Sequence, residues 1–144
     1  MAEERFKAHI CAYLILENKN SILLSLRQGT GYADGEWNLP SGHVENGETV
    51  TQAICREAKE EIGVHIKPED LEPAHIMYRQ SNRTNVDVFM RCTRWEGEIT
   101  NCEPNKCGGL QFYPYIALPP ETSDYIKTLF ILLSEKKFYS ELGW

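Results

Sequence analysis

The sequence lacks several features that would define a protein class. None of its 144 residues lies in a stretch that approaches 18 consecutive apolar residues, so no membrane-spanning helix or membrane partner is expected. The opening MAEERFKAHI has charge but neither the apolar core nor the cleavage site of a secretory signal, so we expect a cytoplasmic protein. Lysine and arginine form no stripe, and the formal net charge is −6, which argues against nucleic acid as a partner.

The number of cysteines is odd. The five cysteines are Cys11, Cys55, Cys92, Cys102 and Cys107. They cannot all pair within one chain, which favours free thiols in a reducing compartment. Cys102 and Cys107 are the two closest, but a zinc site needs further Cys or His residues at short spacing, and none follows. Free thiols are therefore favoured over zinc.

The composition is that of an ordinary globular domain. Hydrophobic residues make up 42% of the chain and charged residues 25%, and this length is enough to bury one core but not two. We expect an N-terminal extension at residues 1–8 and a single domain at residues 9–144.

Hydrophobic patterning predicts alternating groups of strands and helices. The expected elements are strands at residues 9–17, 21–27, 71–79, 86–95 and 110–113 and helices at residues 49–62 and 123–136. Residues 18–20 and 81–85 are predicted turns, and residues 28–36 form a loop that contains three glycines. This order is typical of an α/β (α+β) sandwich with one mixed sheet, although it does not choose the topology.

The first predicted helix carries an unusual concentration of acid. Its apolar positions, followed by a glycine stop at Gly63, are Ala53, Ile54, Ala58 and Ile62. Glu57, Glu60 and Glu61 stand at i, i+3 and i+4, so three carboxylates share one helical face and repel each other. Mg²⁺ relieves such repulsion, because it binds one or two carboxylates and shares its other positions with water and substrate phosphates. The alternative is a solvated charged face, which is the usual meaning of a charge run.

The segment GHVENGETVTQAICREAKEEIGV, residues 42–64, resembles the Nudix box, G-x5-E-x7-R-E-U-x-E-E-x-G-U, at every fixed position. Ala58 is a small residue in the first aliphatic slot, a mild departure. The resemblance implies the Nudix αβα sandwich, with a mixed β-sheet between helices and the box as loop–helix–loop. It also implies hydrolysis of the pyrophosphate linkage of a nucleoside diphosphate bonded to another group.

The resemblance implies a metal site as well, with Mg²⁺ as the cofactor and Mn²⁺ as a substitute. Its expected ligands are the main-chain carbonyl of Ser41 and the carboxylates of Glu57, Glu60, Glu61 and Glu103. Glu103 is included because the MutT-like branch places an acid just beyond a Trp-Glu-Gly-Glu stretch, which here is Trp95 to Glu98. The alternative for Glu103 is an exposed loop carboxylate.

Roles in catalysis follow from the same resemblance. The expected catalytic residues are Glu57, Glu60, Glu61 and Arg56. We favour Glu60 as the general base and expect Arg56 to aim a catalytic glutamate. Glu48 would brace the junction of loop and helix, and Gly42 and Gly63 are expected to be structural.

The substrate is less defined by the sequence. Signatures of the ADP-ribose, dinucleoside polyphosphate, NADH and coenzyme A branches are missing or misplaced. The better likeness is to MutT-type nucleoside triphosphate pyrophosphatases, in which Arg27 resembles a phosphate contact and Tyr32 and Asn38 occupy positions of the base pocket. The alternatives are a surface charge, loop packing and a turn-stabilising amide. Residues 120–124, PETSD, depart from the segment that reads an oxidised base in that branch, which leaves the base preference open.

We therefore expect a (d)NTP pyrophosphohydrolase that releases NMP and pyrophosphate from a small nucleotide. An RNA 5′-pyrophosphohydrolase and a non-catalytic nucleotide-binding module are the competing hypotheses. The chain keeps all box glutamates, which favours catalysis. The sequence is compatible with a monomer or a homodimer.

Overall fold

The computed structural model describes residues 3–144, so the expected extension at residues 1–8 lies partly outside the described residues. The elements, in chain order, are β1 (His9–Asn18), β2 (Ser21–Arg27), β3 (Trp37–Asn38), β4 (Ser41–His43), α1 (Val50–Ile62), the 3-10 turn η1 (Pro68–Asp70), β5 (Glu72–Gln80), β6 (Thr84–Cys92), β7 (Cys107–Pro114), α2 (Asp124–Ser134) and β8 (Tyr139–Leu142).

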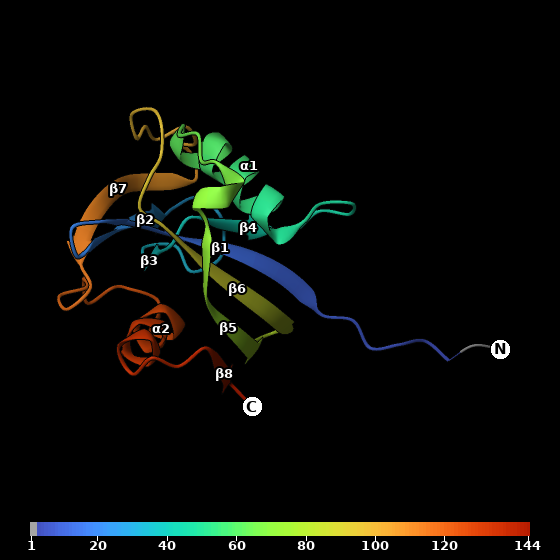
Figure 1. The fold of residues 1–144 in the computed structure, drawn as a ribbon. Helices are drawn as coiled ribbons and strands as arrows, with labels where there is room; N and C mark the ends of the chain where they lie inside the picture. The colour runs from blue at the N-terminus through green and yellow to red at the C-terminus, as the bar shows by residue number, and fades with distance from the viewer. Residues whose placement is uncertain (1–2) are drawn as a thin grey trace.

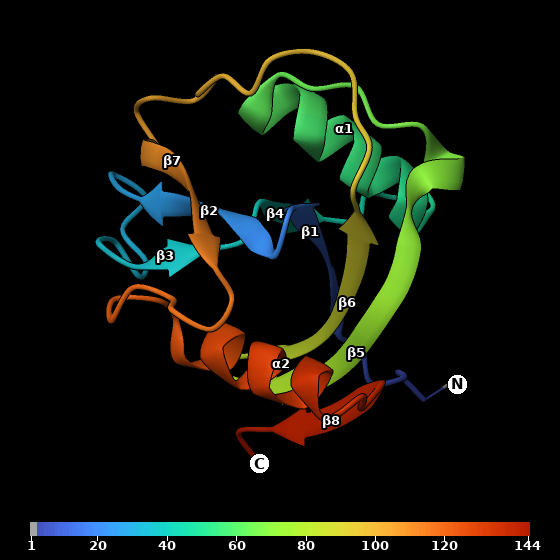
Figure 2. The same ribbon diagram turned by 60° about the vertical axis from the view of Figure 1, so that its left-hand side comes forward.

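The strands form one strongly curved mixed sheet. Its order is β3-β2-β1-β6-β5-β8, with β4 attached to β1 and β7 attached to β2. The β1–β6 and β5–β8 pairs are parallel, and the other pairs are antiparallel. Figure 1 shows the central position of β1, and Figure 2 shows α1 and α2 on opposite sides of the sheet. The expected αβα sandwich with a mixed sheet is confirmed.

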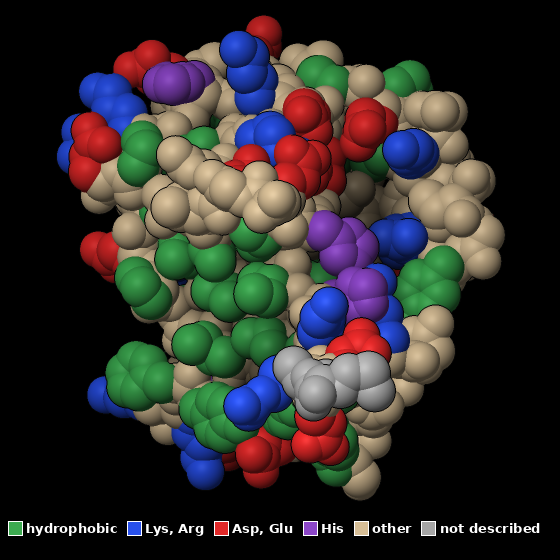
Figure 3. Space-filling model, turned by 90° about the vertical axis from the view of Figure 1, so that its right-hand side faces the viewer, with side chains coloured by type: hydrophobic (Ala, Val, Ile, Leu, Met, Phe, Trp, Pro, Cys, Tyr) green, Lys and Arg blue, Asp and Glu red, His purple; other side chains and the backbone are tan. Residues whose placement is uncertain are grey.

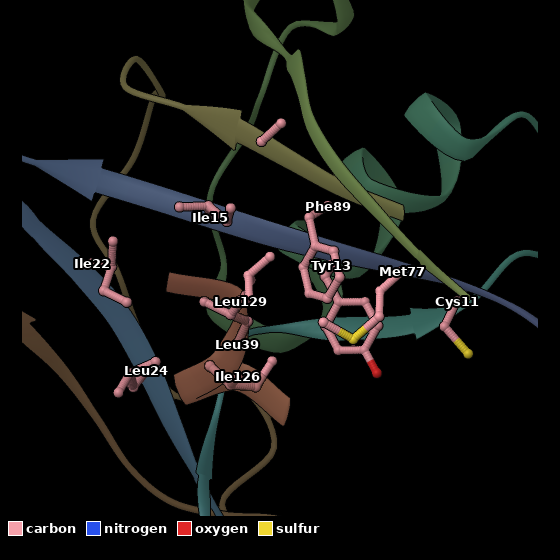
Figure 4. Packing of buried hydrophobic residues seen from close by; sticks show 11 residues of the cluster. Cys11, Tyr13, Ile15, Ile22, Leu24, Leu39, Met77, Phe89, Ile126 and Leu129 are labelled. Carbon is pink, nitrogen blue, oxygen red and sulfur yellow. The ribbon is translucent and has the colours of Figure 1, made fainter. Parts of the chain in front are cut away.

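Strand β1 is buried on both faces, and its alternate side chains enter two different cores. Cys11, Tyr13 and Ile15 join the core beneath α2, where Ile126 and Leu129 are fully buried (Figure 4). The intervening β1 residues, with the apolar residues of α1, form the other core: Ala12, Leu14, Leu16, Ala53, Ile54, Ala58 and Ile62. Successive side chains of a strand point to opposite faces of the sheet, so β1 packs against both helices. This packing fixes the position of each helix relative to β1.

Helix α1 is capped at both ends. Thr49 accepts a hydrogen bond from the Gln52 backbone N–H, and the Gln52 side chain accepts one from the Thr49 N–H, which forms a capping box. Gly63 adopts φ 72°, and its N–H donates to the carbonyls of Ala58 and Lys59. This left-handed conformation is the reason that glycine ends the helix.

The structure corrects several expected boundaries. The strand expected at residues 110–113 begins at Cys107, and Gly108 and Gly109 concealed this start because glycine has little strand propensity. The turn expected at residues 81–85 is shorter, because β6 already begins at Thr84. Strands β3, β4 and β8 were not predicted; each has four residues or fewer and depends on pairing with a distant strand. Within residues 3–144, no helix combines the length and apolarity needed to cross a bilayer.

Candidate active site

Two adjoining cavities share part of their lining. The smaller, of about 670 Å³, is lined by the acidic face of α1, and the larger, of about 1190 Å³, extends toward the start of α2. Their shared lining residues are Arg27, Asn38, Ser41, Gly42 and His43. Figure 3 shows acidic side chains beside a hollow, with histidine and basic side chains on its other side. One elongated ligand can therefore occupy both cavities.

Gly42 allows α1 to approach the sheet closely. Strand β4 pairs with β1, with Gly42 opposite Ala12, and this pairing places residue 42 directly under the helix. A Cβ atom at position 42 would overlap the carboxylate of Glu57. The first glycine of the box is therefore required for space, and its absence of a side chain lets Glu57 lie against the strand.

Arg56 organises the carboxylates around it. Its Nε and Nη2 atoms donate to the two oxygens of Glu48 at 2.7 and 3.1 Å, a bidentate contact. Its Nη1 atom donates to Glu57 at 2.7 Å and to Glu60 at 3.2 Å. Arg56 also donates to the His43 carbonyl, so it joins α1 to β4. This arrangement fits the expected function of Arg56 as an aiming residue.

Glu48 connects the box loop to the helix. Its carboxylate accepts hydrogen bonds from Arg56 and from the Glu45 backbone N–H, and both lower the pKa of Glu48. Glu48 therefore remains ionised as the partner of Arg56. These contacts are those of a residue that braces the loop–helix junction.

Glu61 is the most perturbed acid of the cavity. Burial, together with the neighbouring carboxyls of Glu57 and Glu103, raises the pKa of Glu61 to about 10, and a backbone hydrogen bond from Ser41 opposes the shift. The side chain of Glu60 is different: it is 55% exposed and paired with Arg56. The structure thus brings together Glu57, Glu61, Glu103 and the backbone of Ser41, while Glu60 lies at the rim.

The loop that carries Glu103 is fixed to the end of α1. The backbone N–H groups of Thr100 and Cys102 donate to the carbonyls of Ile62 and Glu61 at 2.9 and 3.1 Å. The last carbonyls of a helix have no partner within it, so the loop satisfies them. This attachment explains how an acid 42 residues after Glu61 reaches the same cavity, which Glu103 lines together with Glu57 and Glu61.

The acidic cavity has the donor chemistry of a magnesium site. Among residues 3–144, no group of three His, Cys, Asp or Glu side chains is arranged so that it could hold a metal ion by itself. Mg²⁺ does not need one, because it retains several waters and binds through one or two carboxylates plus substrate phosphates. Neighbouring carboxyls raise the pKa of Glu61, and within residues 3–144 Glu61 forms no salt bridge. The residues therefore fit a hydrated divalent cation held by Glu57, Glu61, Glu103 and Ser41.

The three expected substrate residues occupy different positions in the larger cavity. Arg27 lines both cavities, and its side chain donates to the Tyr32 carbonyl and the Thr30 hydroxyl. Tyr32 is 59% exposed on the cavity wall, with its ring 5.7 Å from the Arg27 guanidinium carbon. Asn38 is only 7% exposed, and its amide nitrogen donates to Tyr125 and Ser123. Asn38 thus organises the cavity wall through its neighbours.

Sequence reasoning missed the polar floor of the larger cavity. Arg79 and Asp87 form a salt bridge at 2.6 Å, and Asp87 is fully buried. Arg83 lies nearby with a nitrogen 2.7 Å from His43 Nε2. One signal was available: Asp87 alternates with Val86 and Val88, so it faces the same side as buried Phe89, and a charge on a buried strand face requires a partner.

Known proteins share this sequence pattern and this fold. A family model described as the NUDIX domain matches residues 5–131. The 8-oxo-dGTP diphosphatase of Proteus vulgaris is 30% identical over 97 residues, covering 67% of this chain and 86% of that protein. An RNA pyrophosphohydrolase of Aeromonas hydrophila is 40% identical over 65 residues, 45% of this chain and 34% of that protein.

A solved structure supports the fold over nearly the whole domain. The MutT NUDIX hydrolase of Burkholderia pseudomallei superposes with a TM-score of 0.80 at 21% identity, covering 88% of this chain and 98% of that chain. The likeness at this identity concerns the arrangement of helices and strands. Together with the family match over residues 5–131, it identifies the chain as a member of the NUDIX domain family, a MutT-like Nudix hydrolase.

Proposed function

We propose that this protein hydrolyses nucleoside triphosphates to a nucleoside monophosphate and pyrophosphate. The observation that carries the proposal is the continuity of an acidic cavity, suited to a cation-bound polyphosphate, with a larger cavity suited to a nucleoside. The larger cavity, at about 1190 Å³, is ample for a nucleoside, since small-molecule sites are typically ~300–1,000 Å³.

Glu57, Glu61 and Glu103, with the carbonyl of Ser41, would hold the divalent cation. When bound, such a cation activates water, neutralises charge on the phosphoryl oxygens and orients the substrate. The protein must also remove a proton from the attacking water. Glu60 is suited to this task as general base, because it is accessible from the cavity and its position is set by Arg56.

The reaction consumes one water. Its oxygen forms a new bond to a phosphorus atom as the bridging P–O bond breaks, and the proton passes to Glu60 and then to solvent. Arg27, at the junction of the cavities, and Lys106, on the acidic cavity wall, supply positive charge for the phosphates of substrate and leaving group. Arg27 ends β2 and Lys106 lies in the turn before β7, so the fold brings two distant parts of the sequence to the same cavity.

The similarity to an 8-oxo-dGTP diphosphatase supports nucleotide triphosphates as the first substrates to test. A panel of canonical and oxidised nucleotides, sugar nucleotides and dinucleotides would be assayed with Mg²⁺ and with Mn²⁺. Released pyrophosphate and phosphate are measured separately. We expect turnover of nucleoside triphosphates with pyrophosphate as product; turnover confined to sugar nucleotides or dinucleotides would contradict the proposal.

The similarity to an RNA pyrophosphohydrolase suggests a second function, removal of pyrophosphate from the 5′ end of RNA. The net charge of −6 argues against it, because RNA binding relies on basic side chains along the phosphate backbone. Incubation with 5′-triphosphorylated RNA beside the free nucleotides decides between the two. We expect the free nucleotides to be the better substrates, with no nucleic acid required.

The cellular setting is part of the proposal. The five cysteines are all free thiols in the structure, which supports a cytoplasmic location. We infer a protein that works as a monomer or a homodimer, which size-exclusion chromatography with light scattering would distinguish.

A further inference from the structure

The loop between β6 and β7 contains an amide side chain, that of Asn101, which spans the acid at the centre of the loop. Asn101 Oδ1 accepts a hydrogen bond from the backbone N–H of Glu103 at 3.1 Å, and Asn101 Nδ2 donates to the carbonyl of Cys107 at 2.8 Å. Cys107 begins β7, so the half-buried amide connects an acid of the cavity to the first residue of a strand. An amide offers, in one plane, the acceptor and the donor that these two contacts require.

Both backbone polar groups of Glu103 have partners within the loop. The N–H is bound by Asn101, and the carbonyl accepts hydrogen bonds from the N–H groups of Lys106 and Cys107 at 2.9 and 2.8 Å. The main chain at Glu103 is therefore fixed, while its side chain lines the acidic cavity. The point from which the carboxylate reaches into the cavity is thus set before any ligand binds.

The rest of the loop is attached independently of Asn101. Its start is bonded to the end of α1, as described above, and Figure 2 shows the loop running past α1 to β7. On the other side, Gln28 donates from its side chain to the Pro104 carbonyl at 2.7 Å and from its backbone N–H to the Lys106 carbonyl at 3.0 Å. Removal of the Asn101 side chain therefore leaves the loop attached in both places and releases chiefly the backbone of its acid.

We propose that Asn101 is a positioning residue, which holds Glu103 in the geometry that the divalent cation requires. This inference rests on the proposed function, because it takes Glu103 to be a ligand of that cation. Mg²⁺ demands near-ideal octahedral geometry, so a displaced ligand binds it poorly. Groups that orient a metal ligand through hydrogen bonds typically contribute about 10- to 100-fold in metal affinity or activity.

The test combines Mn²⁺ binding, followed by electron paramagnetic resonance, with steady-state kinetics at saturating Mn²⁺. Asn101→Ala removes both hydrogen bonds, and we expect the Kd for Mn²⁺ to rise about tenfold and kcat to fall about tenfold or more. KM for the nucleoside triphosphate should stay within about twofold of wild type, because Asn101 lines neither cavity. Asn101→Ser, whose hydroxyl can form the same turn more weakly, should give smaller losses of both kinds.

Asn105→Ala is the matched control. Asn105 is an exposed residue of the same loop and lines neither cavity, so its replacement should change neither the Kd for Mn²⁺ nor kcat.

A double-mutant cycle with Glu103→Gln separates positioning from a merely structural role. A residue that acts through Glu103 loses its effect when that carboxylate is gone. Asn101→Ala should therefore change the Mn²⁺ Kd and kcat of Glu103→Gln by less than about twofold. An effect of full size in that background would overturn the inference, and so would wild-type values in folded Asn101→Ala.

Failure of the proposed function looks different from failure of this inference. If wild type binds Mn²⁺ but hydrolyses no nucleoside triphosphate, the proposed function fails, and the Mn²⁺ titrations alone decide the role of Asn101. If wild type is active but Glu103→Gln binds Mn²⁺ equally well, the inference fails while the hydrolytic function stands. If Asn101→Ala does not fold, Asn101→Ser carries the same cycle, and equal losses with and without the Glu103 carboxylate contradict the proposal.

Discussion

Replacing Glu61 by glutamine should stabilise the metal-free protein while it abolishes activity. In the folded protein, burial and the carboxyls of Glu57 and Glu103 raise the pKa of Glu61 to about 10. In the unfolded chain the pKa of glutamate is about 4.3. Above that value the folded protein retains a proton that the unfolded chain releases. The free energy of unfolding therefore falls as the pH rises from about 4.3 toward 10.

The size of the effect follows from the shift. Each pH unit within this range costs a little over 1 kcal/mol, so raising the pH from 6 to 8 costs at most about 3 kcal/mol. The coupled carboxyls share the proton, and we expect about 2 kcal/mol. A divalent cation at about 100 times its Kd restores about 2.7 kcal/mol, because it binds only the folded state. Glu61→Gln carries no charge and should show neither effect.

Urea unfolding, followed by tryptophan fluorescence, measures the effect of pH and the effect of magnesium on the free energy of unfolding. Wild type, Glu61→Gln and the control Glu69→Gln, an exposed acid on η1, are compared at pH 6 and pH 8, in EDTA and in magnesium. Differences between proteins at each pH remove the contributions of other titrating groups. The reasoning is refuted if Glu61→Gln in EDTA loses as much stability between pH 6 and pH 8 as wild type, or gains as much from magnesium.

Three further substitutions test separate parts of the site. Glu60→Gln should cut kcat by orders of magnitude, yet shift the melting temperature little because an exposed ion pair contributes only ~0–1 kcal/mol; near-normal turnover would remove Glu60 from the mechanism. Gly42→Ala should cost about 1–3 kcal/mol in urea unfolding and at least about tenfold in kcat, because the new methyl group displaces Glu57; unchanged kinetics would contradict the close approach of α1. Thr49→Ala should cost about 1 kcal/mol of stability through loss of the capping box, with KM unchanged; Thr49→Ser, which keeps the cap, is its control.

Much of the local structure was predictable from the sequence. The apolar spacing on α1, its glycine stop and the β1–β2 hairpin were all predicted, because each depends on residues within about two turns of helix or one strand. The alignment of Glu57, Glu60 and Glu61 on one helical face also follows from local geometry. Their functions were expected from the resemblance of residues 42–64 to the Nudix box, and the sequence pattern placed Glu103 beside the same site.

Contacts between distant segments were decided by the tertiary structure. The short strands β3, β4 and β8 exist only because another strand supplies their hydrogen bonds. The position of Asn38 in the protein interior, bonded to residues 85 and 87 positions later in the chain, was equally inaccessible to periodicity. Sequence spacing reports which side chains share an element, but it does not report which elements meet.

The two cavities differ in how much of each could be predicted from the sequence. The acidic cavity takes three of its carboxylates, Glu57, Glu60 and Glu61, from one helix, and helical periodicity predicted that these three would share a face. The cavity floor joins Arg79 and Asp87 from neighbouring strands to Tyr125 from the far helix. Only the folded chain could bring these three groups together. The charged pair becomes buried, and therefore dependent on its partners, only when the strands and the helix pack around it.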